Sequence, residues 1–145
     1  MTKTYVGDVM HHGIISCPTE TTVQEALTIM TNNRIHAVVV VDGPGYLAGI
    51  VSQTDMLRAW QGGSSYEMIF DGPVSEIMTH SVVTCRPDME LERAIKLLNR
   101  NQIHRLVVAE ERNDGRFWPV GMLSMSDIVR YLELVPEERT GILAP

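Results

Sequence analysis

Gly49-Ile-Val-Ser-Gln-Thr-Asp55 returns later in the chain as Gly121-Met-Leu-Ser-Met-Ser-Asp127, and this pair of stretches decides the fold. Both read Gly-h-h-Ser-x-x-Asp, where h is an apolar residue, and both stand where an expected strand turns into a helix. Upstream, residues 6–41 match residues 74–109 at a constant shift of 68 positions, and a four-residue insertion in the second copy raises the shift to 72. The chain is therefore an internal duplication.

Each copy predicts the same succession of elements. In the first copy, the capping-box pattern Thr22-x-x-Glu25 opens an amphipathic helix that ends near Asn33. β-Branched runs predict the strands that follow, and the polar insertion around Asn113-Asp114-Gly115 is expected at the tip of a hairpin. The predicted strands are residues 37–41, 47–51, 105–109 and 120–123, and the further predicted helices are residues 54–60, 91–99 and 126–134.

The duplication also sets the expected domain boundaries. Residues 1–60 form the first domain and residues 74–135 the second, with a linker at 61–73 and a tail at 136–145. The linker begins with Gly and Ser, so it is expected to be an exposed connector. The expected fold class is α/β (α+β), with two domains of β-α-β-β-α type.

Composition argues against several kinds of partner. The 145 residues carry a net charge of −6 and a pI near 5.3, so neither nucleic acid nor an anionic membrane would attract the chain. The longest purely apolar run, Ala37–Val41, is far shorter than the roughly 20 residues of a membrane helix, and no signal-peptide core is visible. Cys17 and Cys85 are too few for a disulfide framework, so we expect free, buried thiols in a reducing, cytoplasmic compartment.

The two Ser-x-x-Asp turns have two interpretations. As helix caps, Ser52 and Ser124 accept hydrogen bonds from first-turn amides, and the Asp three residues later bonds back. The same geometry suits a ligand, because a carboxylate at a helix start can accept both vicinal hydroxyls of a ribose while nearby amides receive a phosphate. Both interpretations stay open from the residues alone.

A second repeated feature precedes the buried strand of each copy, as Ile103-His104-Arg105 and Ile35-His36-Ala37. His104 and Arg105 can donate charge-assisted hydrogen bonds to phosphate oxygens, and Arg105 can grip two oxygens at once. The alternative is that each His packs at the edge of the core and Arg105 is a solvated surface charge. Recurrence of the His at corresponding positions favours the ligand.

The order of a Met-ended leader (Val6–Met10), a short strand, an amphipathic helix, His before an apolar strand and Gly-h-h-Ser-x-x-Asp resembles the CBS domain family, twice over. The resemblance implies two copies packed with pseudo-twofold symmetry, two clefts that bind AMP, ADP, ATP, S-adenosylmethionine or a related adenosyl ligand, and a homodimer. It also implies site residues. The ribose hydroxyls would be held by Asp55 and Asp127, and the residues near ribose and phosphate would be Ser52, Thr54, Ser124 and Ser126. The phosphates would face His36, His104 and Arg105. The adenine would be lined by residues of the short first strand, namely Ile14, Ile15, Val82 and Val83.

The two copies differ from the family pattern and from each other. Val39 and Val107 replace a proline that is common in the family after the His, and Ala37 stands where the second copy has Arg105. The resemblance therefore implies one stronger and one weaker site. The acidic pair Glu110-Glu111 favours a monophosphate or an adenosyl compound over a triphosphate.

No pattern in the sequence indicates an enzyme. Cys17 and Cys85 are expected in the core, and the histidines of the two leaders, His11, His12 and His80, lack a carboxylate that would complete a metal shell. We expect no catalytic residue, no metal and no cofactor, with the adenosine compound acting as an effector and the regulated target an unidentified protein. The alternative function is a ligand-free protein-protein interaction or dimerisation adaptor. Apolar residues around the connector would form its interface, unless they are buried against their own domain. Those apolar residues are Trp60, Tyr66, Met68, Ile69 and Phe70.

Overall fold

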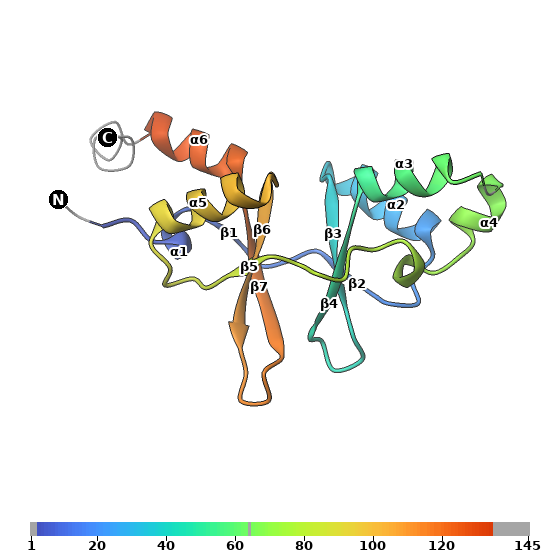
Figure 1. Ribbon diagram of the computed structural model, residues 1–145, viewed down its shortest axis with the longest axis horizontal. Coiled ribbons are helices and arrows are strands. Elements are labelled where there is room, and N and C mark those ends of the chain that lie inside the picture. The colour runs from blue at the N-terminus through green and yellow to red at the C-terminus, as the bar shows by residue number, and fades with distance from the viewer. Residues whose placement is uncertain (1–2, 64, 135–145) are drawn as a thin grey trace. The chain divides into compact units, whose positions relative to one another are not determined.

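The computed structural model describes residues 3–63 and 65–134, so the expected tail at 136–145 lies outside the described residues. The chain divides into two compact units. One unit runs from Ile15 to Val82, and the other combines residues up to Ile14 with residues from Val83 onward. Within each unit, helices cover one face of a sheet (Figure 1). None of the helices in the described ranges has the length and apolar character needed to cross a membrane.

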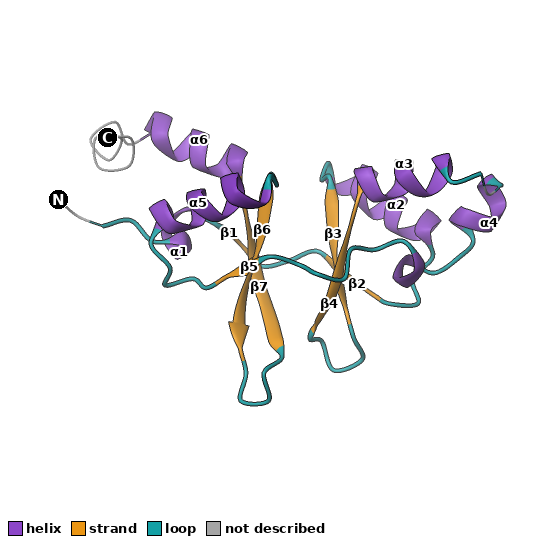
Figure 2. Cartoon of the chain, in the orientation of Figure 1, coloured by secondary structure: helices purple, strands orange, loops and turns teal. Residues whose placement is uncertain are grey.

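The Ile15–Val82 unit is built on a three-stranded sheet in the order β2-β3-β4. Figure 2 shows the strands in orange and the helices in purple. Strand β2 runs parallel to β3, and β3 runs antiparallel to β4. The strands are β2 (Ser16–Pro18), β3 (Ala37–Val41) and β4 (Leu47–Ser52), and the helices are α2 (Val23–Asn33), α3 (Gln53–Gln61), α4 (Tyr66–Phe70) and the 3-10 helix η1 (Val74–Glu76).

The other unit, formed by residues up to Ile14 and from Val83 onward, has a four-stranded sheet in the order β1-β7-β6-β5. Strands β5 and β6 are parallel, whereas β7 pairs antiparallel with both β6 and β1. The strands are β1 (His11–His12), β5 (Thr84–Cys85), β6 (Arg105–Glu111) and β7 (Phe117–Ser124), and the helices are α1 (Val6–Val9), α5 (Leu91–Asn101) and α6 (Met125–Leu134).

The predicted helices and strands are present, and the β-α-β-β-α order is confirmed in both units. Local chemistry explains the helix boundaries. The Thr22 hydroxyl accepts a hydrogen bond from the Glu25 amide at 3.1 Å, which satisfies one of the free donors at the start of α2. At the other end, Arg34 closes α2 with φ of 55° and Gln102 closes α5 with φ of 53°, so both helices end on a left-handed residue at the same repeat position.

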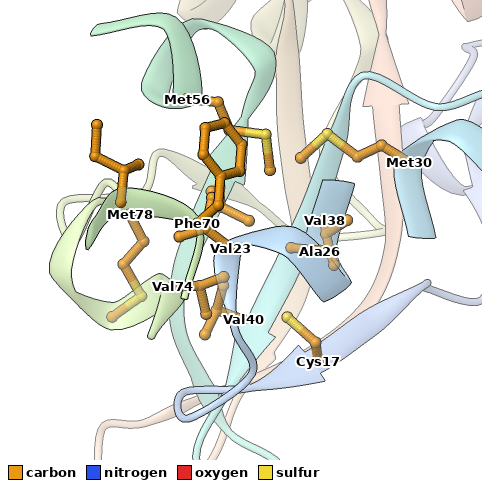
Figure 3. Packing of buried hydrophobic residues seen from close by; sticks show 12 residues of the cluster. Cys17, Val23, Ala26, Met30, Val38, Val40, Met56, Phe70, Val74 and Met78 are labelled. Atoms are coloured by element: carbon orange, nitrogen blue, oxygen red, sulfur yellow. The ribbon is translucent and has the colours of Figure 1, made fainter. Parts of the chain in front are cut away.

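The core of the Ile15–Val82 unit lies between its sheet and its helices (Figure 3). Val38 and Val40 of β3 pack against Val23 and Met30 of α2 in one cluster of buried side chains. Ile69 and Phe70 of α4, each 8% exposed, belong to the same cluster. The expectation of an exposed connector is therefore wrong for Ile69 and Phe70, whose burial removes apolar surface from water, whereas Tyr66 and Met68 are exposed as expected.

The two β-hairpins show where the four extra residues of the second repeat are placed. Strands β3 and β4 have five and six residues, whereas β6 and β7 have seven and eight. The turns are equivalent, since the Asp42 amide donates to the Tyr46 carbonyl at 2.9 Å and the Arg112 amide donates to the Arg116 carbonyl at 2.8 Å. The prediction of an enlarged hairpin tip is wrong, because the insertion lengthens both strands and adds ladder hydrogen bonds.

The leader of each repeat folds with the other repeat. Val6 and Met10 belong to the buried cluster of the second repeat, and Val74 and Met78 belong to that of the first. A leader with a single helical turn cannot bury its own apolar side chains, so it packs into the core of the other repeat. The compact units and the sequence repeats therefore have different boundaries.

The glycine of each Gly-h-h-Ser-x-x-Asp stretch lies directly beneath a leader. A Cβ atom on Gly49 would lie 2.7 Å from Met78 Sδ and 2.8 Å from the carbonyl oxygen of Thr79. A Cβ on Gly121 would meet the carbonyl oxygen of His11 even more closely. Only glycine admits this approach of two backbones, a role that the sequence pattern alone does not reveal.

Candidate functional site

The Ser-x-x-Asp turn of the Ile15–Val82 unit forms the expected helix cap. Asp55 Oδ2 accepts hydrogen bonds from the Ser52 amide at 2.8 Å and from the Ser52 hydroxyl at 3.0 Å, and that hydroxyl accepts from the Asp55 amide at 3.2 Å. The other carboxylate oxygen accepts from the Thr79 hydroxyl at 3.1 Å and lies 3.6 Å from Arg58 Nη1. With 5% of its side chain exposed, Asp55 has protein donors at both oxygens.

The corresponding turn at the start of α6 is more open. Asp127 Oδ2 accepts from the Ser124 amide at 2.9 Å, and the Ser124 hydroxyl accepts from the Asp127 amide at 3.1 Å. Asp127 Oδ1 faces Arg130 Nη1 at 3.5 Å, and 18% of the Asp127 side chain is exposed. The cap interpretation is confirmed in both units, and the second carboxylate keeps more access to solvent.

The strand register brings the predicted basic residue to the second turn. Arg105, the first residue of β6, pairs with Ser124, the last residue of β7, and in an antiparallel ladder such partners project from the same face. Burial lowers the pKa of the half-buried Arg105 guanidinium, which makes no ion pair with any residue in the described ranges. The equivalent pair in the other unit is Ala37 with Ser52, which lacks the cation.

The two predicted histidines contribute to the turns through their backbones. The His36 carbonyl accepts from the Gln53 amide at 3.1 Å, and the His104 carbonyl accepts from the Met125 amide at 2.9 Å. Both side chains are exposed. The alternative interpretation, in which each His packs at the edge of the core, is therefore wrong, and each exposed His lies beside a helix start.

The remaining predicted contacts lie around these turns. Thr54 and Ser126 are exposed residues in the first turns of α3 and α6. The four residues expected to line an adenine lie in the loop segments just before β2 and β5, so their placement on the strands themselves is wrong. These four residues are Ile14, Ile15, Val82 and Val83.

The predicted site residues are divided between the two units. The Ile15–Val82 unit contains Ile15, His36, Ser52, Thr54, Asp55 and Val82. The other unit contains Ile14, Val83, His104, Arg105, Ser124, Ser126 and Asp127. Thr79, which the sequence reasoning missed, has one signal only, namely that it occupies the repeat position of His11.

A family model for the CBS domain matches the chain at residues 6–62 and again at residues 74–134. The two matches together cover well over half of the 145 residues. The chain belongs to the CBS domain family. Each matched CBS domain follows the sequence repeat and includes a leader that folds with the other CBS domain.

Two comparisons place the CBS pair among known proteins. The CBS domain-containing protein YhcV of Bacillus subtilis (strain 168) is 31% identical over 124 residues, which are 85% of this chain and 81% of YhcV. The mitochondrial CBS domain-containing protein CBSX3 of Arabidopsis thaliana is 35% identical over 121 residues, which are 79% of this chain but 54% of CBSX3. The chain thus spans most of one relative and about half of the other.

Solved structures confirm the fold of the CBS pair. A putative acetoin utilization protein, AcuB, from Vibrio cholerae superposes with a TM-score of 0.80 at 26% identity, over 95% of this chain and 96% of that chain. A structure of CBSX2 in complex with AMP superposes with a TM-score of 0.76 at 25% identity, over 90% of this chain and 97% of that chain.

The cysteines of the two CBS domains are buried, free thiols, as expected. Burial raises the pKa of both, and it raises the pKa of Cys85 to about 11. A thiol that stays protonated near neutral pH is a poor nucleophile and a poor metal ligand. Within residues 3–63 and 65–134, no three His, Cys, Asp or Glu side chains lie close enough to hold a metal ion.

Proposed function

We propose that this CBS pair is a regulatory module that binds an adenosine-containing ligand and catalyses no reaction. AMP, ADP, ATP and S-adenosylmethionine are the candidate ligands. The observation that carries the proposal is that Arg105, a half-buried cation, pairs in register with Ser124, the residue that caps α6 together with the partly exposed Asp127.

The chemistry of this turn suits a nucleotide. Asp127 presents a carboxylate oxygen to two ribose hydroxyls, and Arg105 offers a fork of donors to a phosphate. Desolvation of Arg105 strengthens its attraction to an anion, because fewer waters compete for its donors. We propose that His104 and Ser126 lie near the phosphate and that Ile14 and Val83 line the adenine.

Two further facts support an adenosine ligand. The structure of CBSX2, 25% identical to this chain, is described as a complex with AMP. The side chain of Arg105 has no acidic partner in the described residues, so a bound phosphate would supply the missing countercharge. We propose a cytoplasmic location, which fits the two free thiols, and a separate target protein that reads the ligand state.

A thermal-shift series on protein freed of co-purified nucleotide tests the proposal. At least one of AMP, ADP, ATP and S-adenosylmethionine at millimolar concentration is expected to raise the melting temperature by about 5 °C, because a ligand that binds only the folded state stabilises it. Asp127→Ala is expected to abolish the shift while lowering the free energy of unfolding by only about 1 kcal/mol, the value of one helix cap. The absence of any shift would favour the adaptor function.

Arg105→Ala separates phosphate recognition from adenosine recognition. Its affinity for AMP is expected to fall about tenfold to a hundredfold, whereas its affinity for adenosine stays within about twofold, since only AMP presents a phosphate. Arg100→Ala, at an exposed position in the last turn of α5, is the control for loss of charge. Equal losses for AMP and adenosine, measured by titration calorimetry, would remove Arg105 from the phosphate role.

A second candidate function, dimerisation, is favoured by exposed apolar residues on the last helix of each repeat. Leu57 and Val129 occupy the same repeat position and are 59% and 64% exposed, and Trp60 is 56% exposed. We propose that these helix faces form a homodimer contact. Wild-type protein is expected to elute as a dimer in size-exclusion chromatography with light scattering, and Leu57→Glu with Val129→Glu as a monomer. A wild type that stays monomeric at high protein concentration would contradict the proposal.

A further inference from the structure

The carboxylates of Asp55 and Asp127 differ in the donors that already occupy them. Asp55 Oδ1 accepts from the Thr79 hydroxyl at 3.1 Å, and 5% of the Asp55 side chain is exposed. Among the described residues, Asp127 Oδ1 is reached by the flexible Arg130 side chain at 3.5 Å, and 18% of the Asp127 side chain is exposed. A ribose could approach Asp127 by displacing a solvated ion pair of little energetic value, but it would have to break a part-buried hydrogen bond at Asp55.

The difference originates in one position of the leaders. Thr79 forms a β-bridge with Ile50, and His11 pairs with Met122 in the same way, so the two leader residues occupy equivalent positions in the two units. Thr79 is short enough to place a hydroxyl on Asp55, whereas His11 is an exposed residue. The identity of one leader residue therefore decides whether the neighbouring carboxylate receives a hydroxyl donor.

The basic residue shows the same asymmetry independently. Arg105 pairs with Ser124 in the unit that contains Asp127, whereas Ala37 pairs with Ser52 in the unit that contains Asp55. Two unrelated differences, one in a leader and one in a strand, thus leave the same unit better equipped for an anionic nucleotide.

We propose that the hydrogen bond from Thr79 keeps the Asp55 carboxylate in a structural role and that Asp127 is the carboxylate that binds the ribose. The chain therefore binds one adenosine-containing ligand. The ligand part of this inference rests on the proposed function. Thr79 is a positioning residue, since it acts through Asp55 and selects which turn can bind.

A double-mutant cycle tests the role of Thr79 without any ligand. Urea unfolding of Thr79→Val, Asp55→Asn and the double variant is expected to show a coupling of about tenfold in the unfolding constant, because Thr79→Val removes the hydroxyl donor and Asp55→Asn removes the charge that strengthens the same hydrogen bond. The matched cycle of His11→Val with Asp127→Asn is expected to show less than about twofold coupling. If Asp55→Asn does not fold, Thr79→Ser replaces it, and retention of wild-type stability by Ser but not by Val supports the inference. Equal coupling in the two cycles, or equal stability of Ser and Val, overturns it.

Titration calorimetry with AMP tests the selection itself. Wild type is expected to bind one AMP per chain, Asp127→Asn to lose at least about tenfold in affinity, and Thr79→Val to keep wild-type affinity at that site. His11→Thr is expected to weaken AMP binding about tenfold, since it offers Asp127 the donor that Thr79 offers Asp55. Two AMP of equal affinity per wild-type chain, or unchanged affinity in His11→Thr, overturns the inference. If wild type binds no AMP, the proposed function fails, and the unfolding cycles alone decide the role of Thr79.

Discussion

Gly121→Ala is expected to destabilise the protein by about 3 kcal/mol, a large share of the roughly 5–15 kcal/mol that holds a domain together. The added Cβ would meet the terminal methyl of Met10 and the carbonyl oxygen of His11. Met10 could move aside, but His11 is fixed by its antiparallel pairing with Met122. The leader must therefore shift away from β7, and urea unfolding followed by circular dichroism measures the loss.

Gly43→Ala is the matched control, because a Cβ atom at Gly43 would have no neighbouring atom within 4 Å. Its stability is expected to equal that of wild type or to rise by about 0.5 kcal/mol, since Ala restricts the unfolded chain. Gly49→Ala should behave like Gly121→Ala, because a Cβ atom at Gly49 would lie 2.8 Å from the Thr79 carbonyl oxygen. If Gly121→Ala were as stable as Gly43→Ala, the close approach of the leader to β7 would be wrong.

Raising the pH from about 8 to about 10.5 is expected to lower the free energy of unfolding of the wild type by about 2 kcal/mol more than that of Cys85→Ala. Burial raises the pKa of the Cys85 thiol from its ordinary value of 9.0 to about 11. The unfolded chain releases this proton near pH 9, whereas the folded chain holds it until about pH 11. In that window the folded state binds more protons, so stability falls as the pH rises. Well below the ordinary pKa, the thiol is protonated in both states and has no effect on the slope.

The comparison isolates Cys85 because every other titrating group is common to both proteins. Ala is small and apolar, so the variant loses a constant amount of packing energy at every pH. Cys17→Ala is a useful companion, since burial also raises the pKa of the Cys17 thiol and the same direction of effect is expected. Parallel pH profiles for wild type and Cys85→Ala, from urea unfolding at each pH, would show that the thiol ionises freely in the folded protein.

Local patterns were sufficient to predict most of the secondary structure. The apolar run Ala37–Val41 forms β3 with the predicted boundaries, because consecutive β-branched residues favour a strand that is buried on both faces. The Thr22 cap and the Ser52 cap both form, because a cap depends on residues within one helical turn. These features need no knowledge of distant parts of the chain.

The hairpin insertion could not be placed from local patterns. Asn113-Asp114-Gly115 has the residues of a turn, yet the first repeat makes an equivalent turn with Asp42-Gly-Pro-Gly. The two hairpins share an irregularity in register, at Val40/Val41 in the first repeat and at Val108/Ala109 in the second. Both strands of the longer hairpin continue beyond it. Extra residues were therefore free to extend the ladder, where each strand pair gains hydrogen bonds that a longer loop would not supply.

By itself, the sequence determined that the chain is a duplicated β-α-β-β-α unit, that each copy carries a capped Ser-x-x-Asp turn, and that the strand after the His begins with a cation, Arg105, in one copy and with Ala37 in the other. The tertiary structure alone decided that each leader joins the opposite repeat, where it places Thr79 on Asp55 and His11 above Gly121. Periodicity and capping are properties of neighbouring residues, so they can be read from the chain. The donors that occupy a carboxylate come from residues 24 positions away, and only packing brings such residues together.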